Sequence, residues 1–175
     1  VWNAPLPDRA PPKVSPTLRT PWVAGSGYTE LDVEYFAQWD AVLAAMGARG
    51  MVAHMMLYVG NKGVAWPPRG SAADDIYWHY VMSRFSAFPA VVLDVSKEAG
   101  SYGVGDEYIR LRLDEIVLRN SHRRLVTAHS GLVWSTACAG CNLTMVSAQV
   151  HFANHSNGSW YDEMLALRAA HPQVP

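Results

Sequence analysis

The chain has 175 residues, of which 50% are hydrophobic and 17% are charged. This composition is typical of one globular domain with a substantial core and excludes a disordered protein. Fourteen basic and fifteen acidic residues give a net charge of -1, which argues against a nucleic-acid partner or an anionic membrane. This near-zero net charge favours a neutral ligand. No apolar run reaches the roughly 20 residues that a membrane span needs.

Residues 1–30 contain more than half of the eleven prolines and show no sustained periodicity, which predicts an irregular segment within a single domain over 1–175. Aromatic residues in this segment favour a long loop that lines a site, and a proline-rich linker is the alternative. The abrupt start at Val1 and the end at Pro175 suggest part of a larger protein.

Beyond this segment, helical and strand patterns alternate along the chain. Asp32 and Ser71 are placed to cap helices, because a side-chain oxygen there can accept a free backbone N–H. The alternation predicts an α/β fold with a parallel sheet. We expect helices at 32–47, 71–88, 106–120 and from 159, and strands at 51–59, 90–95, 125–129 and 144–152.

Polar or aromatic residues mark the end of each predicted strand: Tyr58, Glu98, His129 and His151. Chemistry spread over several strand ends is typical of a (β/α)8 TIM barrel, and a full barrel needs about 250 residues. The sequence therefore predicts part of such a barrel, with about four of its units. A glycine-rich fingerprint for a dinucleotide is missing, so we expect no cofactor.

Several segments of the chain form a familiar set: Tyr35-Phe36 with Asp40, Arg49–Val52, Tyr77–Phe85, Ala90–Asp94 with Glu98, and Thr127-Ala-His129. Over about residues 31–175 this set resembles the apiosidase-like (β/α)8-barrel glycoside hydrolases, and Tyr77–Phe85 and Ala90–Glu98 are its most specific parts. The resemblance implies that the strands are the third to sixth of the barrel and that Glu98 is the general acid/base of a retaining mechanism. It places the nucleophile, a second glutamate, beyond Pro175.

Lys97 departs from the family pattern, in which an asparagine precedes the acid/base. A cation beside Glu98 lowers the pKa of a carboxyl group that a general acid needs raised. Two hypotheses follow: a glycoside hydrolase that cleaves a polysaccharide or glycan, or a catalytically inactive barrel that binds carbohydrate or serves a structural role in a larger extracellular glycoprotein.

Each candidate residue has a structural alternative. Glu98 can serve the site or form a salt bridge. In a regular strand Asp94 points to the same side as Glu98, but more than about 10 Å away. We therefore interpret Asp94 as a core acid that pairs with a neighbouring His or Arg, and His54 as a core histidine with satisfied hydrogen bonds.

The predicted sugar contacts come from strand ends and from the loops that follow them. Exposed indole faces can stack on sugar rings, and polar side chains can hydrogen-bond hydroxyl groups. Packing within the protein is the alternative for each. The residues are Tyr58, Trp66, Lys97, His129, Trp134, Gln149 and His151.

Three glycosylation sequons, at Asn142, Asn154 and Asn157, suggest a secreted, extracellular glycoprotein. Cys138 and Cys141 fit a short-loop disulfide in an oxidising compartment, with two reduced thiols as the alternative. Zinc would need further ligands at suitable spacing, and no second Cys pair exists, so we expect no metal.

Overall fold

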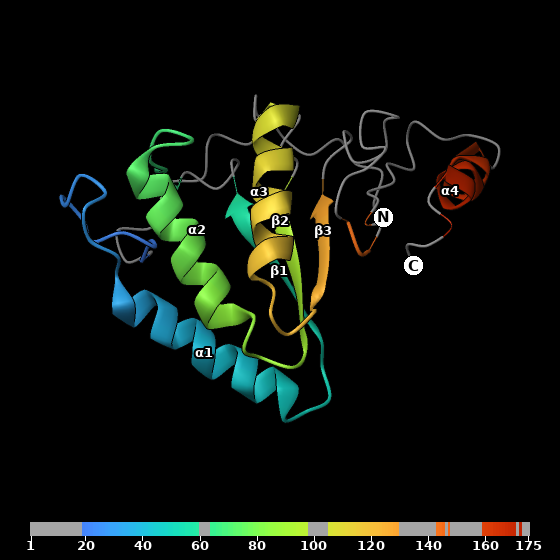
Figure 1. Cartoon of the computed structure of the whole chain (residues 1–175). Helices are drawn as coiled ribbons and strands as arrows, with labels where there is room; N and C mark the ends of the chain where they lie inside the picture. Colours follow the sequence, from blue (N-terminus) through green and yellow to red (C-terminus); the bar gives the residue numbers. More distant parts are fainter. Residues whose placement is uncertain are drawn as a thin grey trace, which may run out of the picture.

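The computed structural model describes residues 19–59, 64–97, 105–129, 143–145, 147, 159–170 and 172. Within these ranges helices and strands alternate as the sequence predicts (Figure 1). The helices are α1 (Val33–Gly47), α2 (Ala72–Phe85), α3 (Asp106–Arg119) and α4 (Ser159–Ala170), and the strands are β1 (Ala53–Val59), β2 (Val91–Lys97) and β3 (Leu125–His129). No helix in this part of the chain is long and apolar enough to span a bilayer.

The predicted caps begin the first two helices. Asp32 accepts a hydrogen bond from the Tyr35 backbone N–H at 3.1 Å, and Ser71 accepts one from the Asp74 N–H at 3.3 Å. The Asp74 carboxylate reaches back to the Gly70 N–H at 2.8 Å, one residue earlier than in a standard capping box. Local side-chain chemistry therefore sets where α1 and α2 begin.

The three strands form an open parallel sheet in the order β1-β2-β3. The prediction of a partial TIM barrel is therefore wrong, although the α/β class and the parallel pairing are correct. Alternating helices and strands specify a parallel sheet, whereas closure also needs enough strands with matched tilt and stagger, which local patterns do not encode. Figure 1 shows the arrowheads of β1 and β3 pointing to the same edge of the sheet.

The predicted strand at 144–152 is not seen in the part that the structure describes, since residues 143–145 and 147 are not in a strand and the others lie outside the described residues. Instead, the Thr144 hydroxyl accepts the Val126 N–H at 2.6 Å. The backbone N–H groups of Thr144 and Met145 both donate to the Val126 carbonyl. A loop therefore occupies this position along β3.

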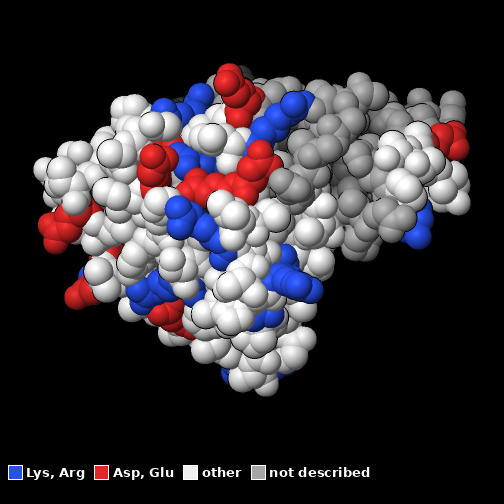
Figure 2. Space-filling view, in the orientation of Figure 1, with Lys and Arg blue, Asp and Glu red and all other residues white. Residues whose placement is uncertain are grey.

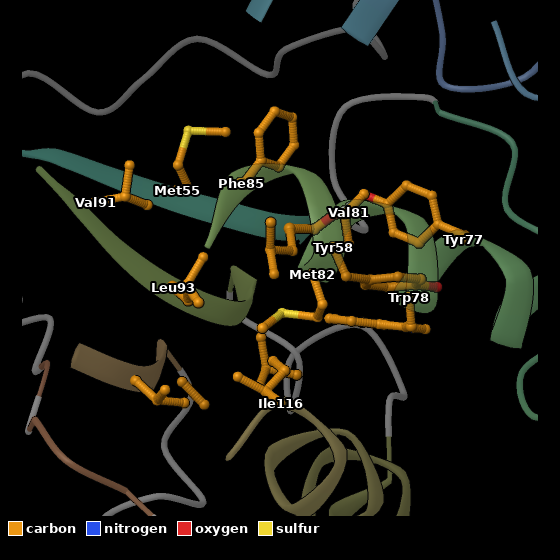
Figure 3. Close-up of a cluster of buried hydrophobic side chains, with 14 of the residues drawn as sticks. Met55, Tyr58, Tyr77, Trp78, Val81, Met82, Phe85, Val91, Leu93 and Ile116 are labelled. Atoms are coloured by element: carbon orange, nitrogen blue, oxygen red, sulfur yellow. Dashed lines mark hydrogen bonds between the residues drawn. The ribbon is translucent and has the colours of Figure 1, made fainter. Parts of the chain in front are cut away.

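The hydrophobic core lies between the sheet and the helices α2 and α3 (Figure 3). Trp78, Val81 and Met82 of α2 and Leu93 of β2 are fully buried, and Ile116 joins them from α3. β2 is buried along both faces up to Ser96, as expected for the central strand of a parallel sheet. The central strand is therefore buried up to the point where the half-buried Lys97 ends it.

A buried ionic network joins α2 to α3. Arg112, with only 1% of its side chain exposed, pairs with Asp74 at 2.5 Å, Asp75 at 2.7 Å and Glu115 at 2.5 Å. Burial lowers the pKa of Arg112, but its hydrogen bonds to these carboxylates and to Tyr108 raise it by more, so the guanidinium stays charged. Figure 2 shows acidic and basic side chains interleaved on the face that carries these helices.

A second, more exposed pair joins α1 to α2. Arg84 Nε lies 3.0 Å from both carboxylate oxygens of Asp40, and its Nη2 lies 2.6 Å from one of them. Tyr77, on the same helix, donates from its hydroxyl to the Leu57 carbonyl of β1. The Tyr77–Phe85 motif therefore holds α2 against its neighbours.

Part of the proline-containing N-terminal segment also packs on this core. Trp22 is buried, with its ring centroid 5.6 Å from that of Tyr28 and 6.4 Å from that of Tyr77. Its backbone forms an isolated bridge to Leu31. The described residues from 19 onward are therefore tied to the domain.

Candidate functional site

The candidate site lies at the carboxyl edge of the sheet, where the three strands end side by side. Val59 of β1 is the register partner of Lys97 of β2, and Lys97 is the register partner of His129 of β3. Open α/β sheets bind ligands beyond the carboxyl ends of their strands. The sheet therefore brings three of the predicted strand ends together.

Lys97 is half-buried at the end of the central strand. Glu98, the next residue in the sequence and the predicted acid/base, lies outside the described residues. The same holds for the other predicted site, glycosylation and cysteine residues: Trp134, Cys138, Cys141, Asn142, Gln149, His151, Asn154 and Asn157.

Asp94 connects all three strands beneath this edge. Its side chain is fully buried, and its Oδ1 accepts backbone N–H groups from Ser96 at 3.0 Å and from His129 at 2.9 Å. Its Oδ2 lies 2.7 Å from Nε2 of His54 on β1. The prediction that Asp94 is a core acid paired with a histidine or arginine is confirmed.

His54 forms a hydrogen bond, as predicted, but the expectation of a core histidine is wrong, because 35% of its side chain is exposed. The hydrogen bond to Asp94 raises the pKa of His54, burial lowers it in part, and the net shift is upward. Asp94 therefore favours the protonated imidazole, and the resulting ion pair spans β1 and β2.

His129 is held through its backbone N–H, whereas one of its ring nitrogens has no partner among the described residues. Its Nδ1 is buried and has no hydrogen-bond partner among the described residues. Leaving a buried polar group unpaired costs about 1–3 kcal/mol, so a buried nitrogen of this kind requires a partner. The described residues do not supply that partner, and the nitrogen is too buried to meet a ligand from solvent.

Trp66 lies against the end of β1. Its ring stacks on the buried Tyr58 with centroids 4.7 Å apart, and its Nε1 donates to the Val59 carbonyl at 3.1 Å. The indole is half-buried in this position. Tyr58 and Trp66 thus pack on each other as the structural alternative describes, and their contact with sugar stays a prediction.

A groove of about 340 Å³ runs beside β1. Its wall includes Tyr35, Phe36 and Trp39 from α1, together with Trp66 and His54. The α1 residues were not among the predicted site residues, although their spacing of one and four positions places them on one side of a helix. Within the described residues, no group of three or more His, Cys, Asp or Glu side chains could hold a metal ion.

Among comparisons with known families, curated proteins and solved structures, a solved structure gives a match. No protein-family profile matches the chain, and no curated protein matches it. The crystal structure of a provisionally assigned glycoside hydrolase from Bacteroides vulgatus ATCC 8482 is similar, with a TM-score of 0.59 and 17% sequence identity. The match covers 70% of this chain and 24% of the other, so the chain spans about a quarter of that protein.

At 17% identity this likeness concerns the fold alone. The apiosidase-like family, which the residue patterns resemble, is not shown. The chain has an α/β fold similar to part of a glycoside hydrolase-like protein.

Proposed function

We propose that the chain carries part of the carbohydrate site of a glycoside hydrolase-like protein, with Glu98 as its general acid/base. One observation carries the proposal: Glu98 directly follows Lys97, which ends the buried central strand between the ends of β1 and β3. Trp66 and His129, both half-buried at this edge, are the proposed neighbouring contacts to a sugar, and the buried Tyr58 supports Trp66 by stacking on it.

The proposed chemistry is acid/base-assisted cleavage of a glycosidic bond. A retaining mechanism needs a second carboxylate about 5–5.5 Å from the first. Asp94 is unsuitable, because it is buried and both of its oxygens already accept hydrogen bonds. The proposed nucleophile must therefore come from outside the described residues.

Lys97 favours a second candidate function, a catalytically inactive carbohydrate-binding module of an extracellular glycoprotein. Lys97 immediately precedes Glu98 in the sequence, and an ammonium group beside a carboxyl group stabilises the ionised carboxylate. An ionised Glu98 can still accept hydrogen bonds from sugar hydroxyls but cannot donate a proton to a leaving group. The two functions therefore differ in the protonation of one carboxyl group.

The variant Glu98→Gln separates these possibilities when it is assayed with oligosaccharides and unactivated phenyl glycosides, whose leaving groups need protonation, and on a glycan array. If Glu98 is the acid/base, Glu98→Gln lowers kcat/KM at least about 100-fold, the usual contribution of general acid catalysis, while glycan binding persists. Lys97→Asn removes the neighbouring cation, so the pKa of Glu98 should rise and the alkaline limb of the pH–rate profile, where the general acid loses its proton, should move to higher pH.

Glu30→Gln is the matched control, because Glu30 is an exposed glutamate in the loop before α1. Wild-type glycan binding without turnover supports the binding module. Turnover that Glu98→Gln leaves unchanged removes Glu98 from the mechanism, and absence of both binding and turnover rejects the carbohydrate proposal.

A further inference from the structure

The outer edge of β1 carries backbone groups without partners among the described residues. β1 lies at one edge of the described sheet, in the order β1-β2-β3 (Figure 1). The Ala53 N–H donates at 2.9 Å to the carbonyl of Ala90, which directly precedes β2. Because N–H groups alternate in direction along a strand, those of His54, Met56 and Tyr58 point away from β2. No described residue pairs with these N–H groups or with the carbonyls of the same residues.

The opposite edge of the sheet, along β3, is covered. The Thr144 hydroxyl and the N–H groups of Thr144 and Met145 bond to the backbone of Val126. Native proteins also protect an exposed edge with a lysine, a proline or a bulge. β1 has the sequence AHMMLYV, without lysine or proline, and it pairs in regular register with β2. The edge of β1 therefore lacks these protections and suits the addition of a strand.

The groove of about 340 Å³ runs along this same edge, because most residues of β1 line it. Its facing wall comes from α1, with Tyr35, Phe36 and the 37% exposed Trp39. None of the described residues that line the groove is Asp, Glu, Lys or Arg. A charged side chain would lose hydration there without gaining an oppositely charged partner, so the groove favours uncharged side chains.

We propose that this groove binds an extended, uncharged segment of a partner protein, which adds to β1 as a further strand. A polypeptide backbone offers alternating N–H and C=O groups at the repeat of β1, so it matches the free groups of that strand. In this mode of recognition the main chain supplies affinity, and pockets for alternate side chains supply specificity. Apolar side chains of the segment lie against Phe36 and Trp39. The inference does not depend on the role of Glu98.

The position of α1 favours a peptide segment over a second copy of the chain. α1 and β1 line the same groove, so α1 flanks the free edge. A single extended chain fits beside β1, whereas the edge of a second sheet would bring its own α1 against the first.

The probe is a blocked peptide of alternating threonine and valine residues, about six residues long, which is a usual strand length. Its binding to the full chain is followed by amide hydrogen exchange in NMR. Exchange at His54, Met56 and Tyr58 should slow about tenfold or more when the peptide saturates the groove. The amides of Met55 and Leu57 point toward β2 and serve as internal references.

Two N-methylated forms of the peptide are a matched pair. One carries methyl groups on two valine amides and the other on two threonine amides, so their side chains and masses are equal. Whichever direction the peptide runs, only one of these alternating sets of N–H groups faces β1. One form should therefore bind at least about tenfold more weakly than the unmethylated peptide, and the other should bind like it.

Trp39→Ala removes an aromatic side chain from the wall of the groove and should weaken peptide binding about tenfold or more. Val42→Ala is the matched control, because Val42 is 45% exposed on the same helix and does not line the groove. The pair of methylated peptides needs no change to the protein, so it decides the question even if Trp39→Ala does not fold.

Equal affinities of the two methylated peptides, or binding that leaves exchange at His54, Met56 and Tyr58 unchanged, overturn the inference. No binding of peptides with valine, leucine or phenylalanine at the alternate positions overturns it as well. Slow exchange of the three amides before any peptide is added also contradicts a separate partner. In that case, a dimer in light scattering identifies a second copy as the occupant, and a monomer shows that the chain covers the edge itself.

Discussion

Two arginine–aspartate pairs hold α2 in place, and they differ chiefly in burial. Arg112 and Asp74 have 1% and 2% of their side chains exposed, whereas Arg84 and Asp40 have 24% and 35%. Replacing Arg112 with methionine leaves the buried carboxylate of Asp74 without its cation. Breaking a buried pair in this way costs about 3–5 kcal/mol of unfolding free energy.

Arg84→Met is the matched comparison. Asp40 becomes better hydrated when its partner is lost, so the expected cost is about 1 kcal/mol or less, in spite of the bidentate geometry. Urea unfolding followed by circular dichroism at neutral pH gives both values. Circular dichroism is preferable to fluorescence, because the Arg112 guanidinium lies 5.6 Å from the Trp78 ring centroid.

The double variant Arg112→Met with Asp74→Leu provides a further check. It removes the stranded charge together with its partner, so it should be more stable than Arg112→Met alone. Two results would show that desolvation of Asp74 does not govern the network. Either Arg112→Met loses no more unfolding free energy than Arg84→Met, or the double variant is no more stable than Arg112→Met.

Three further predictions follow from the sheet and its edge. Because the folded-state pKa of His54 lies above its unfolded value, its pairing with Asp94 stabilises the fold fully below about pH 6.5 and progressively less as the pH rises through the folded pKa. Solvent screening limits this stabilisation to about 1 kcal/mol. Urea unfolding of the wild type and of His54→Gln between pH 5 and pH 9, roughly the range over which histidines titrate, measures it, and the variant should lack the loss of stability that the wild type shows as the pH rises. Leu93→Ala should cost about 2–5 kcal/mol in urea unfolding, since Leu93 is fully buried, and a value below about 1 kcal/mol would contradict the assigned core. Trp66→Ala should increase hydrogen exchange at the end of β1 by removing its bond to the Val59 carbonyl; unchanged exchange would mean that this contact does not hold the strand end.

The candidate site was only partly predictable from the sequence. Tyr58 and His129 were recognised because polar or aromatic residues follow apolar runs, and Lys97 because it stands where the resembling family has asparagine; the parallel sheet brings the ends of these strands together. The pairing of Asp94 with a neighbouring histidine or arginine was also predictable, because a lone acid inside a buried strand requires a partner. The stacking of Trp66 on Tyr58, and the lack of a partner for His129 Nδ1 within the described ranges, depend on tertiary packing and had no local signal.

The sequence by itself determined the α/β class, the succession of elements from α1 to β3 and the start of α1 and α2. These features depend on spacing and on capping side chains such as Asp32 and Ser71, which act within a few residues. Only the tertiary structure decided that the described sheet is open, that β2 gains a residue relative to β3, and that Arg112 lies at the centre of a buried network. The physical reason is that these features depend on contacts between residues that are far apart in the chain. Such contacts form only when the fold brings the strands and the charged side chains together.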